Sequence, residues 1–203
     1  MRKMLLAAVL LLASVAVSAQ ESAGSLTLQP KAGLNISSLM DWNRVKVGYC
    51  VGAELEYRIT EGFSLSAAAL YSEQGGCDKN SKKTTTLSLG YLNIPLMASL
   101  YVVKGLALKV GVQGGIRVRA AATDDGMKAD VGPFINDYFH VLGDNVQLSK
   151  YIISIPIGLS YEWKNAVFDM RYIYGMTSYV TSADPLRNNV FQFTLGYKLL
   201  GKK

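Results

Sequence analysis

The sequence contains a single histidine, His140, and it lies among residue types that hydrolases use. Asp137 and Asp144 flank it closely, and Ser149 follows. A serine nucleophile, a histidine base and an aspartate that orients the base make up the triad of many hydrolases. Spacing along one segment does not supply the geometry of a triad, and a lone histidine among aspartates lacks the ligand spacing of a metal site. We therefore expect no catalytic residue, no metal and no cofactor, with a lipid-modifying enzyme as an alternative.

Charged residues also occur at every second position of segments that are otherwise apolar. Side chains two residues apart on a β-strand share one face, so acids and bases from several strands would meet on one side of a sheet. An unpaired buried charge is costly, so we expect an ion-pair network, with a gated pore or a proton path as the alternative. The network consists of Glu54, Glu56, Arg58, Lys109, Glu162, Asp169 and Lys198.

A second charged set is entirely basic. Lys46, Arg117, Arg119 and Arg171 share the phase of the first set, but no acid shares their level. The segment 122–149 is rich in aspartate and apolar residues, and we expect it to fold over these bases and pair with them. An anionic ligand at a basic mouth is the alternative. The aspartates of the segment are Asp124, Asp125, Asp130, Asp137 and Asp144.

Two cysteines, Cys50 and Cys77, allow one disulfide. Strand pairing about a turn at Glu61 places Cys50 opposite Ser72, five residues short of Cys77. The chain would have to fold back to bring the two Cα atoms within the separation of about 7 Å that a disulfide needs. A disulfide between Cys50 and Cys77 therefore stands as an alternative to two free thiols.

These charged and sulfur-containing residues are positioned by segments in which apolar and polar residues alternate. The clearest runs from Val45 to Ile59, where odd positions are apolar and even positions are small, polar or charged. A period of two is typical of a β-strand with two unlike faces. The pattern predicts eight strands, at 26–35, 45–59, 63–73, 85–102, 106–121, 150–163, 166–177 and 189–200.

The connections between these strands fall into two classes that alternate. Tight turns are expected at 60–62, 103–105 and 164–165. Longer polar connections are expected at 36–44, 74–84, 122–149 and 178–188. In an antiparallel sheet this order puts every short turn at one end and every long loop at the other. Bacterial membrane barrels have the same asymmetry, with short periplasmic turns and long external loops.

Three positions interrupt the alternation. In the fourth strand the apolar positions are odd up to Leu89 and even from Leu92, and a bulge at Gly90–Tyr91 would restore one face. Pro95 and Pro156 lie inside strands, although proline has no N–H for a ladder of hydrogen bonds. We expect local bulges at both prolines.

The aromatic residues favour a membrane barrel over a soluble sandwich. They lie on the apolar face at two heights, eight to ten residues apart along a strand. At about 3.3 Å per residue and a tilt near 40°, that distance matches the apolar band of a membrane barrel, with aromatic belts at both interfaces. The predicted fold is all-β, an eight-stranded antiparallel transmembrane β-barrel whose lumen is filled by its own side chains. The belts comprise Tyr49, Tyr57, Tyr71, Tyr151, Tyr161, Trp163, Phe168, Tyr174 and Tyr197.

Residues 1–19 have the three parts of a secretory signal peptide. Arg2 and Lys3 precede an apolar stretch, and the small residues Val17-Ser18-Ala19 precede Gln20. We expect cleavage near Ala19–Gln20 and a single barrel domain over residues 20–203. Without Arg2 and Lys3 the formal charge falls from +6 to +4 and no basic run is present, which argues against nucleic-acid binding.

Several motifs occur in an order that resembles a known family. They are SVAVSAQ at the end of the signal, KAGLNISSL in the first strand, LNIPLMASLY followed by GVQGG in the centre, and IPIGLSYEW and FQFTLGYKL near the end. With these motifs the chain resembles the small porin-like outer-membrane β-barrels of Gram-negative bacteria, the PorT-like and OmpA-barrel-like group. The resemblance implies an eight-stranded barrel in the outer membrane and carries no catalytic residues.

These observations predict a non-enzymatic outer-membrane barrel that acts through its external loops in binding, adhesion or envelope integrity. A narrow porin-like channel for small, preferably anionic solutes is the first alternative, and a lipid-modifying enzyme is the second. The expected partners are outer-membrane lipid, lipopolysaccharide and the barrel-assembly machinery. No motif identifies an external partner, and we expect a monomer.

Overall fold

The computed structural model describes residues 23–39, 45–80, 83–124, 127–131, 149–177 and 188–199. No helix long and apolar enough to cross a membrane occurs within these ranges. The described residues form strands joined by turns. The strands are β1 (Leu26–Leu39), β2 (Lys46–Thr60), β3 (Phe63–Asn80), β4 (Lys83–Val103), β5 (Leu106–Asp124), β6 (Met127–Val131), β7 (Tyr151–Trp163), β8 (Ala166–Gly175) and β9 (Asn188–Tyr197).

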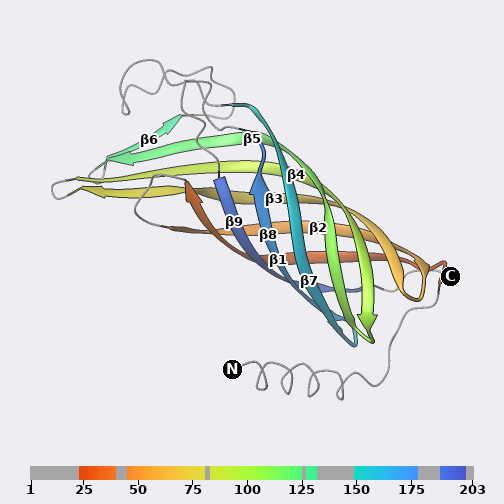
Figure 1. The fold of residues 1–203 in the computed structure, drawn as a ribbon. Helices are drawn as coiled ribbons and strands as arrows, with labels where there is room; N and C mark the ends of the chain where they lie inside the picture. Colours follow the sequence, from red (N-terminus) through yellow and green to blue (C-terminus); the bar gives the residue numbers. More distant parts are fainter. Residues whose placement is uncertain are drawn as a thin grey trace.

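Eight of these strands close into an antiparallel barrel (Figure 1). The ring runs β1, β2, β3, β4, β5, β7, β8 and β9, and the pairing of β9 with β1 completes it. The short strand β6 pairs with the upper part of β5 and lies outside the ring. The prediction of an eight-stranded antiparallel barrel is therefore confirmed, with β6 as an addition.

The three short turns lie together at one end of the barrel, on the lower right of Figure 1. They consist of residues 61–62, 104–105 and 164–165, as the sequence predicted. Two-residue hairpin turns favour positive φ, and both Gly105 (φ 81°) and Lys164 (φ 55°) have it. This end is called the turn end below, and the opposite end is called the loop end.

At the loop end the strands are longer than the sequence predicted. β3 and β4 stay paired as far as Asn80 and Lys83, and β5 continues to Asp124 and pairs with β6 over its last five residues. The pairing of β2 with β3 ends at Cys50 and Ser72, and β3 to β6 continue as a four-stranded sheet beyond the ring. Three successive β-branched residues, 84–86, favour the extended conformation in this hairpin. The expected loop at 74–84 is therefore wrong, and the one at 122–149 begins with a hairpin.

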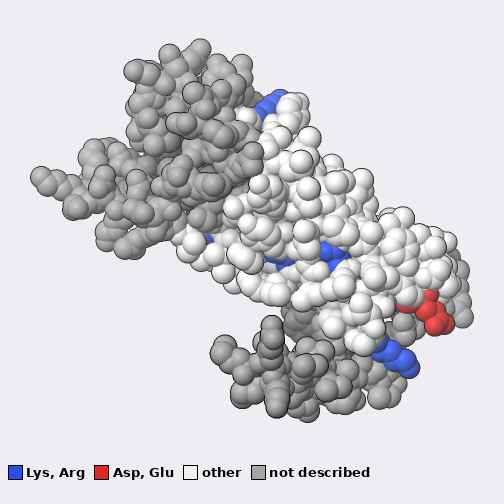
Figure 2. All heavy atoms as spheres, in the orientation of Figure 1, with Lys and Arg blue, Asp and Glu red and all other residues white. Residues whose placement is uncertain are grey.

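The two faces of the barrel have the polarity opposite to that of a soluble protein. Val47 is 62% exposed on the outside, whereas the Glu54 side chain is fully buried on the inside. The odd positions of β2 are exposed from Val47 to Tyr57, apart from the half-buried Ala53, as the alternation predicted. Figure 2 shows that the described surface along the strands is mostly uncharged, with acidic groups in view at the turn end and basic groups at both ends and partway along the barrel.

An irregularity between β4 and β5 changes which residues face inward. The register shifts between Gly90 and Tyr91, where the sequence predicted a bulge. The unpaired residue is Val118 on β5, however, and not a residue of β4. As a result Leu89 stays inside the barrel, and Arg119 lies exposed on the outer face.

The bulges expected at the two prolines are absent. Pro95 pairs in register with Gln113, and Pro156 pairs in register with Ile173. On its other side each proline interrupts the ladder without changing the register. Each proline therefore removes hydrogen bonds from the ladder locally, but neither strand carries an extra residue there and no bulge forms.

Candidate functional site

The centre of the barrel interior holds five charged side chains, here called the central ion cluster: Lys31, Glu54, Lys109, Asp169 and Arg171. Alternation along each strand turns them inward, from β1, β2, β5 and β8. Glu54 lies in the middle and accepts hydrogen bonds from Lys109 at 2.8 Å and from Arg171 at 2.6 Å. The ammonium group of Lys31 is 2.9 Å from the same carboxylate.

Asp169 is the second anion of the central ion cluster. Its carboxylate lies 3.1 Å from Arg171 and 3.5 Å from Lys109, and it also accepts a hydrogen bond from Lys31. β1 and β5 lie on opposite sides of the eight-stranded ring, so Lys31 and Lys109 reach the same two carboxylates from opposite walls. The cluster therefore spans the diameter of the lumen, and its side chains are almost completely buried.

Closer to the turn end lies a second group, here called the turn-end cluster: Glu56, Arg58, Tyr101, Glu162 and Lys198. Arg58 donates to both oxygens of Glu162, at 3.2 and 3.3 Å, and Lys198 is 2.9 Å from the same carboxylate. The Tyr101 hydroxyl lies 2.7 Å from Glu56 and 2.5 Å from Glu162, and the Arg58 guanidinium stacks on its ring at 3.8 Å. Opposite charges are therefore paired at this level too.

The seven residues of the predicted network all lie in these two clusters. Sequence reasoning missed Lys31 and Tyr101, which complete the central ion cluster and the turn-end cluster respectively. A signal for Lys31 was available, because Leu26, Leu28 and Leu34 occupy even positions of β1 and turn the odd positions inward. Tyr101 lacks such a signal, since a tyrosine in an amphipathic strand of this kind suits the outer belts equally well.

Above the central ion cluster the buried side chains are uncharged, and apolar groups alternate with neutral polar groups. The buried side chains at this level, here called the apolar layer, are Cys50, Leu70, Leu89, Tyr91, Ile152, Ile173 and Val190. Amides and hydroxyls accompany them: Asn35 donates to Ser72 at 2.8 Å and accepts from Gln192 at 3.0 Å. The apolar layer has no ionic partner to offer a charged solute.

The basic upper lumen expected from the sequence is wrong in three of its four members. Arg171 belongs to the central ion cluster. Lys46 pairs with Glu73 at 2.6 Å. Arg119 is turned outward by the bulge at Val118, whereas the half-buried Arg117 keeps the expected phase and level.

Two further hypotheses concern the loop end. Cys50 is a buried free thiol opposite Ser72, and β3 continues without a fold-back to Cys77, which pairs with Thr86. Five residues of strand separate the two levels by about 16 Å, so the structure does not bring Cys50 and Cys77 together. His140 and most of the acidic segment at 122–149 lie outside the described residues, so their roles stay predictions. Within the described ranges, no group of three His, Cys, Asp or Glu residues could hold a metal ion.

The aromatic residues assigned to belts all lie on strands at outward positions. Tyr57, Tyr161, Trp163, Phe168 and Tyr197 are near the turn end, where Tyr161 pairs with Phe168 in register. Tyr49, Tyr71, Tyr151 and Tyr174 are nearer the loop end, and the rings of Tyr49 and Tyr71 are 5.8 Å apart. A lysine accompanies each belt: Lys164 lies 5.6 Å from the Trp163 ring, and Lys150 lies 5.7 Å from the Tyr151 ring.

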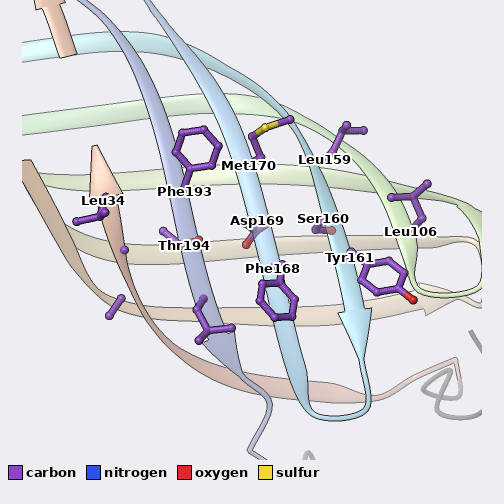
Figure 3. Close-up of a pocket in the computed structure, with 13 residues that line it drawn as sticks. Leu34, Leu106, Leu159, Ser160, Tyr161, Phe168, Asp169, Met170, Phe193 and Thr194 are labelled. Carbon is purple, nitrogen blue, oxygen red and sulfur yellow. The ribbon is translucent and has the colours of Figure 1, made fainter. Parts of the chain in front are cut away.

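One depression of about 450 Å³ lies on the outer face across β1, β9, β8 and β7 (Figure 3). Its walls are apolar side chains, among them Leu34, Phe193, Met170 and Phe168. Asp169 also borders it, but the Asp169 carboxylate belongs to the central ion cluster. The depression therefore offers shape and apolar contact without groups for catalysis.

Comparison with known proteins agrees with this architecture. Residues 18–180 match the family described as outer membrane protein beta-barrel domain. Neisserial surface protein A aligns with a TM-score of 0.55 and 16% identity, over 86% of this chain and 97% of that one. The attachment invasion locus protein Ail of Yersinia pestis aligns with a TM-score of 0.50 and 13% identity, over 87% of this chain and 99% of that one.

At these identities the solved structures support the fold alone. None of the curated proteins matches the sequence. The family match covers most of the chain, and it agrees with the closed ring, the apolar outer face and the two aromatic belts. The chain therefore belongs to the outer membrane protein beta-barrel domain family, and its place is the outer membrane.

Proposed function

We propose that this protein is a non-enzymatic outer-membrane barrel with a closed lumen, which acts at the cell surface through its loop end in binding, adhesion or envelope integrity. The observation that carries the proposal is the central ion cluster. Three cations and two carboxylates from four strands meet across the full diameter of the lumen. A ring of eight strands has an interior just wide enough for such side chains to fill it.

Two successive layers support a closed lumen. An ion that entered from the turn end would have to separate buried ion pairs, and the charges left without partners would be strongly destabilised. It would then meet the apolar layer, where Leu70 and Leu89 offer no polar group to replace its water shell and the accompanying amides and hydroxyls carry no charge. A channel would need both layers to move at once.

The sheet beyond the ring supports a role at the surface. β3 to β6 continue past the last pair of β2 with β3, and the two outer strands of this sheet are β3 and β6. Among the described strands β6 pairs only with β5, so it forms one edge of the described sheet. An exposed strand edge can add an extended segment of a partner. Ail is named for attachment, and the proposal gives this chain a role of the same kind at the surface.

Planar bilayer recordings of the purified mature protein test the closed lumen. The wild type should show no steady open-state current. A variant with Glu54→Ala, Arg171→Ala and Tyr91→Ala, which removes side chains from both layers, should conduct and serves as the positive control. Steady current through the folded wild type, identified by its heat-modifiable mobility on gels, would contradict the proposal and favour the channel.

Shortening the β3–β4 hairpin tests the surface role separately. Removing residues 76–87 and closing the strands with a two-residue turn should reduce adhesion of cells that display the protein, or weaken their resistance to detergent. The matched control inserts two glycines into the turn at 61–62, which lies at the opposite end of the barrel. Equal adhesion and equal detergent resistance in all three strains would contradict a function of the loop end.

A further inference from the structure

The bulge on β5 has an effect on the outer face of the barrel. Because Val118 is unpaired, Arg119 points away from the lumen although its position in sequence predicted an inward side chain. It is paired with Gly90 of β4, and Gly90 is paired with Glu73 of β3. A guanidinium therefore stands on the apolar face, at the level of the belt near the loop end.

Gly90 leaves room on that face for two side chains to converge. A Cβ atom at Gly90 would lie 2.5 Å from the Tyr71 hydroxyl oxygen and 3.1 Å from the Cβ of Arg119. The Tyr71 phenol and the Arg119 side chain therefore meet over the glycine. The ring of Tyr49 on β2 continues the row, 5.8 Å from the ring of Tyr71.

A second cation lies just before the next strand of the ring, β7. The backbone N–H of Arg117 donates to the carbonyl of Lys150 at 2.9 Å, which fixes the start of β7 beside β5. Lys150 is exposed, and its ammonium lies 5.7 Å from the ring of the outward-facing Tyr151. The outer cationic row is defined here as the outward Tyr49, Tyr71, Arg119 and Tyr151 together with Lys150, which is exposed although it stands opposite Arg117. The carboxylate of Glu73, beside Gly90 on β3, borders the row and is paired with Lys46. Figure 2 shows basic atoms at this end of the described surface.

We propose that the outer cationic row binds the phosphate of a phosphorylated glycolipid in the outer leaflet, of the lipopolysaccharide class. The row lies at the end opposite the short turns, which in this family of folds faces the cell exterior. Aromatic belts mark the headgroup level of the membrane, so Arg119 and Lys150 stand where lipid phosphates lie. Guanidinium and ammonium groups form strong charge-assisted hydrogen bonds with phosphate, and phenol hydroxyls add donors for phosphate or sugar oxygens.

The glycolipid is favoured over a soluble anion because the cations flank apolar outward side chains. Ile116 on β5 and Ile153 on β7 are exposed just below Arg119 and Lys150. A ligand that fills this site should therefore combine acyl chains with a phosphate at one height, as a membrane lipid does. The inference goes beyond the proposed surface role, since it holds whether or not the lumen conducts.

Retention of lipid by the mature protein tests the inference. The protein is folded into phosphatidylcholine vesicles that contain bisphosphorylated lipid A and is then extracted in mild detergent. Native mass spectrometry measures how much of the protein retains bound lipid A. Removing one cation near a charged lipid surface weakens binding roughly fivefold, so Arg119→Gln with Lys150→Gln should lower lipid A retention by more than tenfold. The matched control, Lys104→Gln with Lys164→Gln, removes two exposed cations at the turn end and should retain lipid A as the wild type does.

Two further lipids identify the group that is recognised. The wild type should retain dephosphorylated lipid A only as weakly as the double variant retains lipid A. The inference would be overturned if the wild type retained both forms of lipid A equally. It would also be overturned if the wild type and the double variant retained lipid A equally. Retention of phosphatidylglycerol as strong as that of lipid A would overturn the assignment to a glycolipid. If the double variant fails to fold, Lys150→Gln alone, which lies outside the strands, should still lower retention about fivefold.

Discussion

The two halves of the barrel interior stabilise the same ring with different chemistry. Toward the turn end, the central ion cluster and the turn-end cluster fill the lumen with paired charges. Toward the loop end, the apolar layer fills it with Leu70, Leu89 and Tyr91. The stabilisation from an ion pair requires a charged partner on another strand, whereas the stabilisation from a buried apolar side chain depends on how well it fills the space. The charged half should therefore respond strongly to the loss of one partner, and the apolar half should respond in proportion to the volume removed.

Removing one partner from the central ion cluster should lower the free energy of unfolding more than any of the substitutions that follow. Glu54→Ala leaves Lys31, Lys109 and Arg171 with Asp169 as the remaining carboxylate of the cluster. Removing one partner of a buried ion pair costs about 3–5 kcal/mol of unfolding free energy. Urea unfolding in phosphatidylcholine vesicles, followed by tryptophan fluorescence, measures the loss. A loss below about 1 kcal/mol, as for exposed ion pairs, would show that the cluster is hydrated.

A cavity in the apolar half should have the next largest effect. Leu89 is 1% exposed and faces the lumen, so Leu89→Ala should cost about 2–5 kcal/mol. Leu92, on the same strand but 39% exposed on the outer face, provides the matched control. Leu92→Ala should cost clearly less in the same urea experiment. Equal losses for the two leucines would contradict an apolar layer inside the lumen.

Removing one hydroxyl from the turn-end cluster should have a smaller effect. Tyr101→Phe keeps the ring on which Arg58 stacks but removes the contacts with Glu56 and Glu162. A hydrogen bond to a charged group contributes about 1.5–3 kcal/mol, so a loss at the lower end of that range is expected. Equilibrium unfolding measures it, and Tyr57→Phe on the outer face is the control. No difference between the two variants would mean that the hydroxyl is not part of the cluster.

The smallest effect is expected for the ion pair outside both clusters. Lys46 and Glu73 form a pair in which the Glu73 side chain is 23% exposed. Partly exposed ion pairs contribute about 0.2–1 kcal/mol and are weakened by salt. Glu73→Ala should therefore cost at most that much, and the cost should shrink in 1 M NaCl. A cost equal to that of Glu54→Ala would remove the distinction between buried and peripheral pairs.

Much of this arrangement follows from alternation along single strands. The closed ring, the short turns and the seven charged residues of the predicted network required only the period of two in each strand. The same rule, applied to β1, would also have placed Lys31 inside. Side-chain phase within one strand is a local property, so the sequence contains it.

The wrong predictions concern positions whose orientation or conformation is decided by the pairing between two strands. Arg119 lies outside because the residue left unpaired is on β5, and which strand carries an extra residue is decided by the pairing of β4 with β5. The prolines keep their register because their neighbours hold them, although proline alone suggests a bulge. The hairpin at 74–84 reads as a loop from its glycines and charges, yet pairing with β4 extends it.

Closure of the ring by β1 and β9 sets the order in which the interior can form. The central ion cluster takes Lys31 from the first strand and Asp169 and Arg171 from the strand before last, so it cannot assemble until nearly the whole chain has been delivered. Until then these side chains remain in water, where their charges keep the exported chain soluble beside its apolar residues. Contacts between such distant parts of a chain form slowly. The side chains that close the lumen are thus the ones that stay hydrated until the last strands pair.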